Sequence, residues 1–272
     1  MPFVRVRDQV VHYTLTGASD APVLMLANSL GTNLHVWDAQ VDAFAASHRV
    51  LRYDMRGHGL TAADDPNVPA TTVAELADDV AGLLDTLEIP RVRFVGLSLG
   101  GLVAQRFAAA YPRRVESLVL CGTANRMGPP EVWTARITAI ANGGMSAIVE
   151  GVMARWFTPR SHAERPELMR GFGTMLERTP AAGYIAGCRA VQAADLRHDD
   201  GRITAPTLVV GGRLDLVATP ILTAELCAAI PGAEMLTLEH SAHILCAEEP
   251  EAFNEAVLRF LSAAQLTSGG KV

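Results

Sequence analysis

Apolar and polar positions divide the chain into short apolar runs and longer segments with helical spacing. A continuous apolar run bounded by Gly or Pro is typical of a strand that is buried on both faces of a parallel sheet. Residues 3–15 instead alternate around a polar break, which predicts an antiparallel hairpin. The runs that predict the remaining strands are 22–27, 48–54, 92–95, 115–121, 206–212 and 234–238.

Segments with helical periodicity follow several of these strands, and they are 72–87, 100–111, 220–230 and 250–261. Thr71 or Thr72 is expected to cap the first helix, with Glu75 as the capping-box partner of Thr72. Pro112 is expected to end the second helix, because proline lacks the amide that would continue it. Since strands and helices alternate, we predict an α/β protein with a mostly parallel, twisted sheet flanked by helices.

The alternation is interrupted between residues 124 and 202. From 124 to about 194 the chain has helical spacing with glycine breaks and no convincing buried strand. We expect 124–202 to be a helical cap, or lid, inserted into a core domain made of 1–123 and 203–266. A cap at this point would cover the carboxyl ends of the strands, where open α/β sheets bind ligands. The tail 267–272 is predicted to be disordered.

The composition is that of a globular protein with a sizeable core. Hydrophobic residues make up 49% of the chain and charged residues 19%, which argues against disorder. The net charge of −6 gives no electrostatic basis for binding nucleic acid. It is compatible with a small anionic substrate, because a local basic pocket can override the overall sign.

Cysteine usage and the N-terminus favour a cytoplasmic protein without disulfides or membrane contact. The four cysteines are Cys121, Cys188, Cys227 and Cys246. None forms a C-x-x-C pair or lies at zinc-ligand spacing from a histidine, so we expect reduced, mostly buried thiols. The first residues lack the apolar core of a signal peptide, and no apolar run approaches the roughly 18 residues of a membrane span. The oligomeric state is left open.

A G-x-S-x-G motif at Gly96–Gly100 places Ser98 between a predicted strand and a predicted helix. In this context the motif forms a sharp turn that exposes a nucleophilic serine. The flanking residues must be small, because the backbone is crowded at such a turn. We therefore interpret Ser98 as a candidate nucleophile, the alternative being a glycine-rich turn of a non-catalytic unit.

A nucleophilic serine needs a base and an acid that orients the base. For a serine in this motif the acid and then the histidine follow along the chain. Asp215 follows the predicted strand 206–212, and His243 follows the predicted strand 234–238. Both loops lie at carboxyl ends of strands, as Ser98 does, so the three side chains are predicted to meet. The weaker candidates are His240, Asp195, Asp199 and Asp200.

Two backbone amides are expected to stabilise the negative oxygen that forms when Ser98 attacks a carbonyl carbon. One is the amide of Leu99 at the start of the following helix. The other is the amide of Leu30, in the loop after the first parallel strand. In that loop, Ser29 is a candidate substrate contact and Asn28 is expected to brace the turn.

Other conspicuous residues are expected to be structural. The loop Asp54–Gly59 is rich in glycine but lacks the Lys-Ser/Thr pair of a phosphate-binding loop. His12, His35 and His58 are expected to be structural histidines. Because H-E-x-x-H is absent and the cysteines are scattered, we expect no metal and no cofactor.

At these residues the chain resembles the α/β-hydrolase superfamily. The landmarks that match, in the family's order, are Asp54–Gly59, Gly96–Gly101, Gly211–Asp215 and His243. More narrowly, nearly the whole chain, cap included, resembles the 3-oxoadipate enol-lactonases of the protocatechuate branch of the β-ketoadipate pathway. The segments that carry this narrower resemblance are Asn28–Trp37, Leu51–Asp54, Arg155–Thr158 and Gly183–Arg197.

The resemblance implies an α/β-hydrolase fold and hydrolysis of 3-oxoadipate enol-lactone to 3-oxoadipate through an acyl-enzyme. Because this substrate carries a carboxylate, a cation from the cap is expected, and Arg136 is the candidate. Trp133 is a candidate to pack on the lactone ring. The alternatives are a solvent-facing arginine and a tryptophan of the cap interior. The chain departs from those lactonases at Leu99, where they usually have Met, and at Ile244–Ala247, where they have an Asn-Ile pair.

Other functions remain compatible with the same three residues. A broad carboxylesterase, a C–C bond hydrolase and a cofactor-free perhydrolase would use the same nucleophile, base and acid. A ligand receptor that keeps the pocket without turnover is a further alternative. It is disfavoured because the order Ser98, Asp215, His243 is intact.

Overall fold

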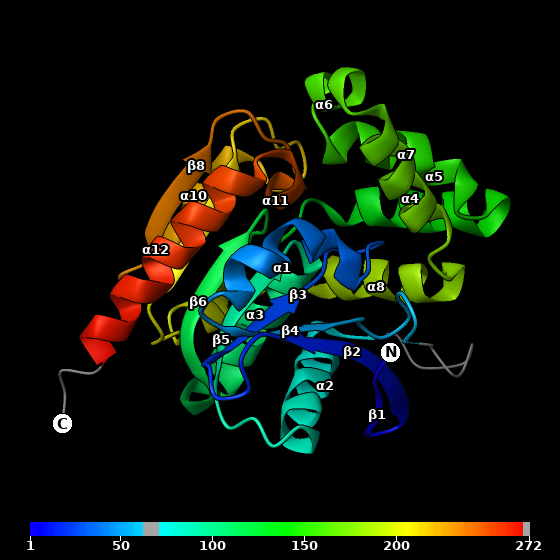
Figure 1. The fold of residues 1–272 in the computed structure, drawn as a ribbon. Coiled ribbons are helices and arrows are strands. Elements are labelled where there is room, and N and C mark those ends of the chain that lie inside the picture. The colour runs from blue at the N-terminus through cyan, green and yellow to red at the C-terminus, as the bar shows by residue number, and fades with distance from the viewer. Residues whose placement is uncertain (62–70, 269–272) are drawn as a thin grey trace.

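A computed structural model describes residues 1–61 and 71–268, and it shows a sheet of eight strands flanked by helices (Figure 1). The strand order is β1-β2-β4-β3-β5-β6-β7-β8. β1 pairs with β2, and β2 pairs with β4, in the antiparallel sense, whereas the other neighbouring strands are parallel, which confirms the predicted hairpin and the predicted α/β fold. The strands are β1 (Phe3–Val6), β2 (Gln9–Thr16), β3 (Val23–Ala27), β4 (Arg49–Tyr53), β5 (Val92–Leu97), β6 (Val115–Cys121), β7 (Thr207–Gly212) and β8 (Glu234–Leu238).

The core helices cover the two faces of the sheet in separate groups. α1 packs against α12, and α2 packs against α3 (Figure 1). Between these helix groups, the strands β3, β5 and β7 of the sheet are buried along nearly their whole length, as continuous apolar runs require. The helices are η1 (Leu34–Trp37), α1 (Asp38–Ala45), α2 (Val73–Thr86), α3 (Leu99–Ala110), η2 (Pro112–Arg114), α10 (Pro220–Ala229), α11 (Leu245–Glu248) and α12 (Pro250–Ser268).

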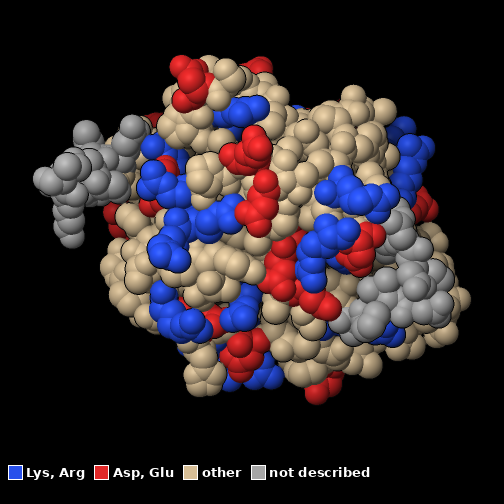
Figure 2. Space-filling view, turned by 90° about the horizontal axis from the view of Figure 1, so that it is seen from below, with Lys and Arg blue, Asp and Glu red and all other residues tan. Residues whose placement is uncertain are grey.

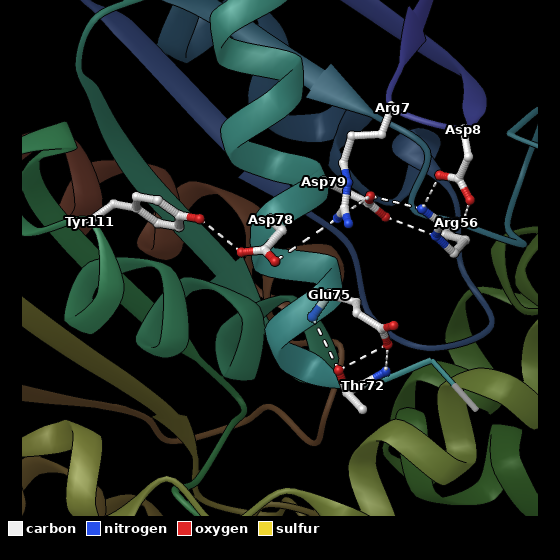
Figure 3. Close-up of polar contacts among 8 residues, drawn as sticks. All are labelled: Arg7, Asp8, Arg56, Thr72, Glu75, Asp78, Asp79 and Tyr111. Atoms are coloured by element: carbon white, nitrogen blue, oxygen red, sulfur yellow. Dashed lines mark hydrogen bonds and ion pairs between the residues drawn. The ribbon is translucent and has the colours of Figure 1, made fainter. Parts of the chain in front are cut away.

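The ends of two helices show how far local sequence decides their limits. Thr72, and not Thr71, caps α2: its hydroxyl accepts from the Glu75 amide at 3.1 Å, while its own amide donates to the Glu75 carboxylate at 2.8 Å (Figure 3). At the other end of the chain, α12 continues to Ser268. The prediction that the disordered tail starts at Thr267 is therefore wrong for its first two residues, and 269–272 lie outside the described residues.

An ion-pair network fixes the β1–β2 hairpin to α2 (Figure 3). The Arg56 guanidinium donates to both oxygens of Asp79, at 2.9 and 2.8 Å, and to both oxygens of Asp8, at 3.2 and 3.0 Å. Arg56 and Asp79 are nearly buried, whereas Asp8 is exposed. Bidentate arginine–carboxylate pairs of this kind have a defined geometry. The network therefore holds the turn after β4, which lies next to the loop after β3.

Helices α4 to α9 lie between β6 and β7, where the cap is predicted. They are α4 (Pro130–Gly143), α5 (Ser146–Trp156), α6 (Pro159–Glu164), α7 (Pro166–Glu177), α8 (Ala181–Ala193) and α9 (Arg197–Asp200). α8 packs against α4 on one side and against α3 on the other, so it joins the outer helices to the core (Figure 1). We keep the name cap for 124–202, and its division from the core as a separate domain stays a prediction.

Two glycines let α8 approach the core closely. A Cβ at Gly183 would lie 2.0 Å from the carbonyl oxygen of Gly57, and a Cβ at Gly187 would lie 2.4 Å from a methyl carbon of Leu30. The two positions are four residues apart, so they share one face of the helix. The backbone of α8 therefore rests directly on the loop that carries Leu30.

Surface charge on the face opposite the cap is mixed. Figure 2 shows basic and acidic side chains interspersed there. Among the described residues, no helix combines the length and apolar character of a membrane span.

Asp200 is a buried carboxyl at the point where the chain returns from the cap to the core. The two crossings are joined by a hydrogen bond from the Leu196 amide to the Asn125 carbonyl at 2.9 Å. Asp200 is fully buried, and burial is the main cause that raises its pKa from 3.8 to about 6, against a lowering contribution from Asn125. Asp200 therefore keeps its proton to a higher pH in the folded protein than in the unfolded chain.

Replacing Asp200 by Asn is expected to stabilise the protein at neutral pH. Because its folded pKa is raised, Asp200 contributes stability below pH 3.8 that is lost as the pH rises through about 6, an effect of roughly 2 to 3 kcal/mol. Urea unfolding of Asp200→Asn should show that gain over the wild type at about pH 8 and almost none at about pH 4. The control Asp199→Asn, which loses an ion pair with Arg106, should show no gain. An equal gain at both pH values would contradict the assignment.

Candidate active site

Ser98 sits at a strained turn between β5 and α3. Its φ of 56° and ψ of −114° are unusual for a residue with a side chain. The turn is crowded: a Cβ at Gly96 would lie 2.3 Å from the Gly100 carbonyl oxygen, and a Cβ at Gly100 would lie 2.3 Å from the Ala27 carbonyl oxygen. The Thr123 hydroxyl donates to the Ser98 carbonyl at 2.9 Å and so helps to hold the turn. The glycines of the motif are thus needed for close backbone contact.

The structure brings the three predicted triad side chains together. Nε2 of His243 lies 2.9 Å from Oγ of Ser98, and Nδ1 lies 2.9 Å from Oδ2 of Asp215. The other oxygen of Asp215 accepts from the amides of Val217 at 2.6 Å and Ala218 at 3.0 Å. A proton on Nδ1 directed at the carboxylate leaves Nε2 free to accept the serine proton. The arrangement can therefore transfer a proton from Ser98 to a buried, oriented imidazole.

The weaker candidates lie elsewhere. His240 is exposed, and its amide donates to Glu249. Asp195 pairs with Arg197, which lowers the pKa of Asp195 to about 2. Asp199 pairs with Arg106. Asp215 and His243 were distinguished from these candidates by their positions after predicted strands and not by residue type.

The two amides predicted to face a negative oxygen come from loops that are tied together. The Gly100 amide donates to the Asn28 carbonyl at 3.0 Å, which joins the start of α3 to the loop after β3. The Asn28 side chain donates to the Tyr53 carbonyl at 2.9 Å, so it braces this loop as expected. Within the described residues, the amides of Leu30 and Leu99 donate to no protein acceptor. Both remain available to a ligand.

A pocket opens above Ser98 and His243. Of the residues predicted to contact substrate, Ser29, Leu30, Trp133 and Arg136 line it, whereas Leu99 is not among the described lining residues. The sequence reasoning missed Val152, Arg155, Trp156 and Val217, which also line it. Arg155 and Trp156 belong to a segment that resembles the enol-lactonases, so that segment was a usable signal. The lining residues include two arginines and, within the described chain, no carboxylate.

Arg136 is held in place within this pocket. Its guanidinium carbon lies 4.9 Å from the centre of the Trp133 ring, and its Nη1 donates to the Tyr184 hydroxyl at 3.3 Å. Trp133 is itself fixed, because its Nε1 donates to the Met127 carbonyl at 2.6 Å. Burial raises the pKa of Tyr184 to about 12, so this phenol stays neutral. Arg136 and Trp133 thus form one packed unit on the pocket wall.

The loop that carries His243 is joined to the cap. The carbonyl of Trp156, at the end of α5, accepts from the amides of His243 at 3.1 Å and Ile244 at 3.0 Å. Glu248 adds a second link: one carboxylate oxygen accepts from the Thr158 amide at 2.8 Å, and the other accepts from the Ala242 amide at 2.6 Å. The first oxygen also accepts from the hydroxyls of Thr158 and Ser161. The position of His243 therefore depends on the cap as well as on Asp215.

We expect Glu248→Gln to lower kcat more than it raises KM. A glutamine amide must turn an NH₂ group toward donors on one side, so either the cap link or the Ala242 link is lost. A displacement of His243 by a fraction of an ångström should reduce kcat by roughly 10- to 100-fold. Steady-state kinetics on a neutral aryl ester would measure it.

The matched control for this variant is Glu249→Gln. Glu249 accepts from the His240 amide and the Ser241 hydroxyl of the same loop but, among the described residues, makes no hydrogen bond to the cap. The variant Glu249→Gln should therefore reduce kcat less than Glu248→Gln does. Equal losses in both variants would mean that the cap link itself has no effect.

The residues expected to be structural have structural partners. Asp54 accepts from His12 Nδ1 and from the amides of Leu34 and Leu60, each at 2.8 Å. His35 contacts Asp38 at the surface, and His58 is buried with Nδ1 3.1 Å from the Arg56 carbonyl. All four cysteines are free thiols, three of them buried. In the described part of the chain, no group of three or more His, Cys, Asp or Glu side chains could hold a metal ion.

Comparison with known proteins defines the class. Residues 22–250 match the family described as the alpha/beta hydrolase fold, and the chain belongs to this family of hydrolases. It is 37% identical to 3-oxoadipate enol-lactonase 2 of Acinetobacter baylyi, over 92% of each protein. The crystal structure of the enol-lactonase from Burkholderia xenovorans LB400 matches with a TM-score of 0.92 and 40% identity, covering 96% of this chain and 100% of that one. The predicted resemblance is thereby confirmed.

More distant relatives bear other names. A Rhizobium rhizogenes protein named as a proposed carbamate hydrolase, RutD, is 29% identical over 93% of this chain and 98% of its own length.

Proposed function

We propose that this chain hydrolyses 3-oxoadipate enol-lactone to 3-oxoadipate, as a step in the breakdown of aromatic compounds. The observation that carries the proposal is the contact of Ser98 with a buried His243, itself held by Asp215, beneath a pocket walled by two arginines. A serine nucleophile suits a carbonyl ester, and the arginines suit an acyl part that carries a carboxylate. The enol-lactonase relatives support the same choice of substrate.

In the proposed reaction, Oγ of Ser98 attacks the lactone carbonyl carbon while its proton passes to Nε2 of His243. Asp215 stabilises the imidazolium that forms. The amides of Leu30 and Leu99 hold the negative oxygen of the tetrahedral intermediate. The ring C–O bond then breaks, and His243 gives its proton to the leaving enol oxygen, so that the acyl group stays on Ser98.

The second half of the reaction releases the acid. His243 removes a proton from a water molecule, whose oxygen attacks the acyl carbon of the Ser98 ester. When the ester bond breaks, His243 returns the proton to Oγ of Ser98. The released enol becomes the ketone 3-oxoadipate by moving one proton from oxygen to carbon.

Ser98→Ala is expected to lower kcat for enol-lactone hydrolysis by about 10⁴-fold or more, because the nucleophile is lost. The decay of lactone ultraviolet absorbance measures the rate, and mass spectrometry of a quenched wild-type reaction should find the acyl group on Ser98. Ser29→Ala is the control, since Ser29 lines the same pocket but contacts no base among the described residues. It should lose far less activity.

The preference for the lactone is tested on the wild-type protein. Its kcat/KM for 3-oxoadipate enol-lactone should clearly exceed the values for p-nitrophenyl acetate and for a simple carbamate. Comparable weak rates on the lactone and the aryl ester would contradict the proposal and favour a broad esterase. A dominant rate on the carbamate would favour the activity that the name of the RutD relative suggests.

A further inference from the structure

The two arginines of the pocket differ in what surrounds them. Arg136 already has partners, because its guanidinium stacks on Trp133 and donates to Tyr184. The side chain of Arg155, on α5, is exposed, and its guanidinium makes no hydrogen bond or ion pair with any residue in 1–61 or 71–268. A guanidinium that faces a pocket without a protein partner keeps its donors free for a ligand.

The rest of the pocket offers no competing charge near this group. No Asp or Glu of the described chain is among its lining residues, and Asp215 lies behind His243, fully engaged. The pocket of this acidic protein, with a net charge of −6, is thus locally basic. A carboxylate that entered it would meet the unpaired Arg155 at lower cost than the packed Arg136, because no existing hydrogen bond has to break.

We propose that Arg155 is the residue that binds the carboxylate of the substrate, while Arg136 shapes the wall and adds charge without direct contact. This assignment rests on the proposed function, and it moves the anion contact from the sequence-predicted Arg136 to the cap helix α5. The ligand class is an ester or lactone whose acyl part ends in a carboxylate. Arg155 can bind both oxygens of that carboxylate through its planar fork.

The position of Arg155 connects binding with chemistry. It is adjacent to Trp156, whose carbonyl holds the amides of His243 and Ile244. A substrate that pairs with Arg155 therefore contacts the helix that positions the base. Neutral esters lack this contact, so we expect the preference for anionic esters to be expressed in kcat/KM.

Two aryl esters with one leaving group test the proposal without the lactone itself. Mono-p-nitrophenyl glutarate carries a terminal carboxylate, and p-nitrophenyl pentanoate has a similar length without it. The wild type should prefer the glutarate ester after correction for its spontaneous hydrolysis. In Arg155→Gln the ratio of the two kcat/KM values should fall about tenfold, and in Arg155→Lys it should fall less, because a point charge remains.

The controls separate local binding from general charge. Arg160→Gln removes an exposed arginine that pairs with Glu164 and does not line the pocket, so the ratio should stay at its wild-type value. Added salt should reduce the wild-type preference, since Arg155 is exposed.

Several outcomes would overturn the assignment. They are a wild type without preference for the glutarate ester, an unchanged ratio in Arg155→Gln, or a larger fall of the ratio in Arg136→Gln than in Arg155→Gln. A wild type that prefers the glutarate ester through Arg155 but leaves the enol-lactone intact would instead overturn the proposed function and keep the anion site.

Discussion

The active-site geometry depends first on the crowded backbone around Ser98. The side-chain-free positions Gly96 and Gly100 allow the end of β5, the start of α3 and the end of β3 to meet within van der Waals distance. This approach brings the loop that carries Leu30 next to the start of α3, where Leu99 lies. The left-handed φ of Ser98 costs of order 1 to 3 kcal/mol, and hydrogen bonds from Thr123 and to Cys121 help to offset it.

Glycines also allow the cap to pack closely against the core. Gly183 and Gly187 let α8 rest on the turn of Gly57 and on Leu30, so the loop that carries one of the two amides is pressed from above. From below, the Asp54 carboxylate and the Arg56 ion pairs hold the adjoining turn. A loop confined from both sides keeps the Leu30 amide in place before substrate arrives, as the proposed role of this amide in stabilising a transition state would require.

Much of this could be predicted from the sequence because the signals are local. The apolar runs defined the strands, the Thr72–Glu75 pair defined the start of α2, and the order of Ser98, Asp215 and His243 followed from loops at strand ends. In each case the residues that determine the feature are close together in the chain or are related by the topology of a parallel sheet. The fold was therefore predictable, and the meeting of the three side chains followed from it.

What the sequence left undetermined depends on packing between distant segments. Glu248 lies near the end of the chain and contacts Thr158 ninety positions earlier, which no periodicity indicates. Asp200 and Asp199 are neighbours of the same type, yet one is buried and the other pairs with Arg106. The sequence could indicate Arg136 as a candidate for the anion contact, but it could not indicate that its guanidinium stacks on Trp133.

The link between the cap and His243 has a consequence for how binding energy is used. An interaction that is equally strong with bound substrate and with the transition state lowers KM without raising kcat. A carboxylate held at α5 can contribute to kcat only if it also improves the position of a reacting group. Trp156, next to Arg155, can provide this connection, since it lines the pocket and its carbonyl accepts a hydrogen bond from the His243 amide. The cap thus helps to fix the proposed catalytic base, and the departure at Ile244–Ala247 begins at a residue whose amide the cap binds.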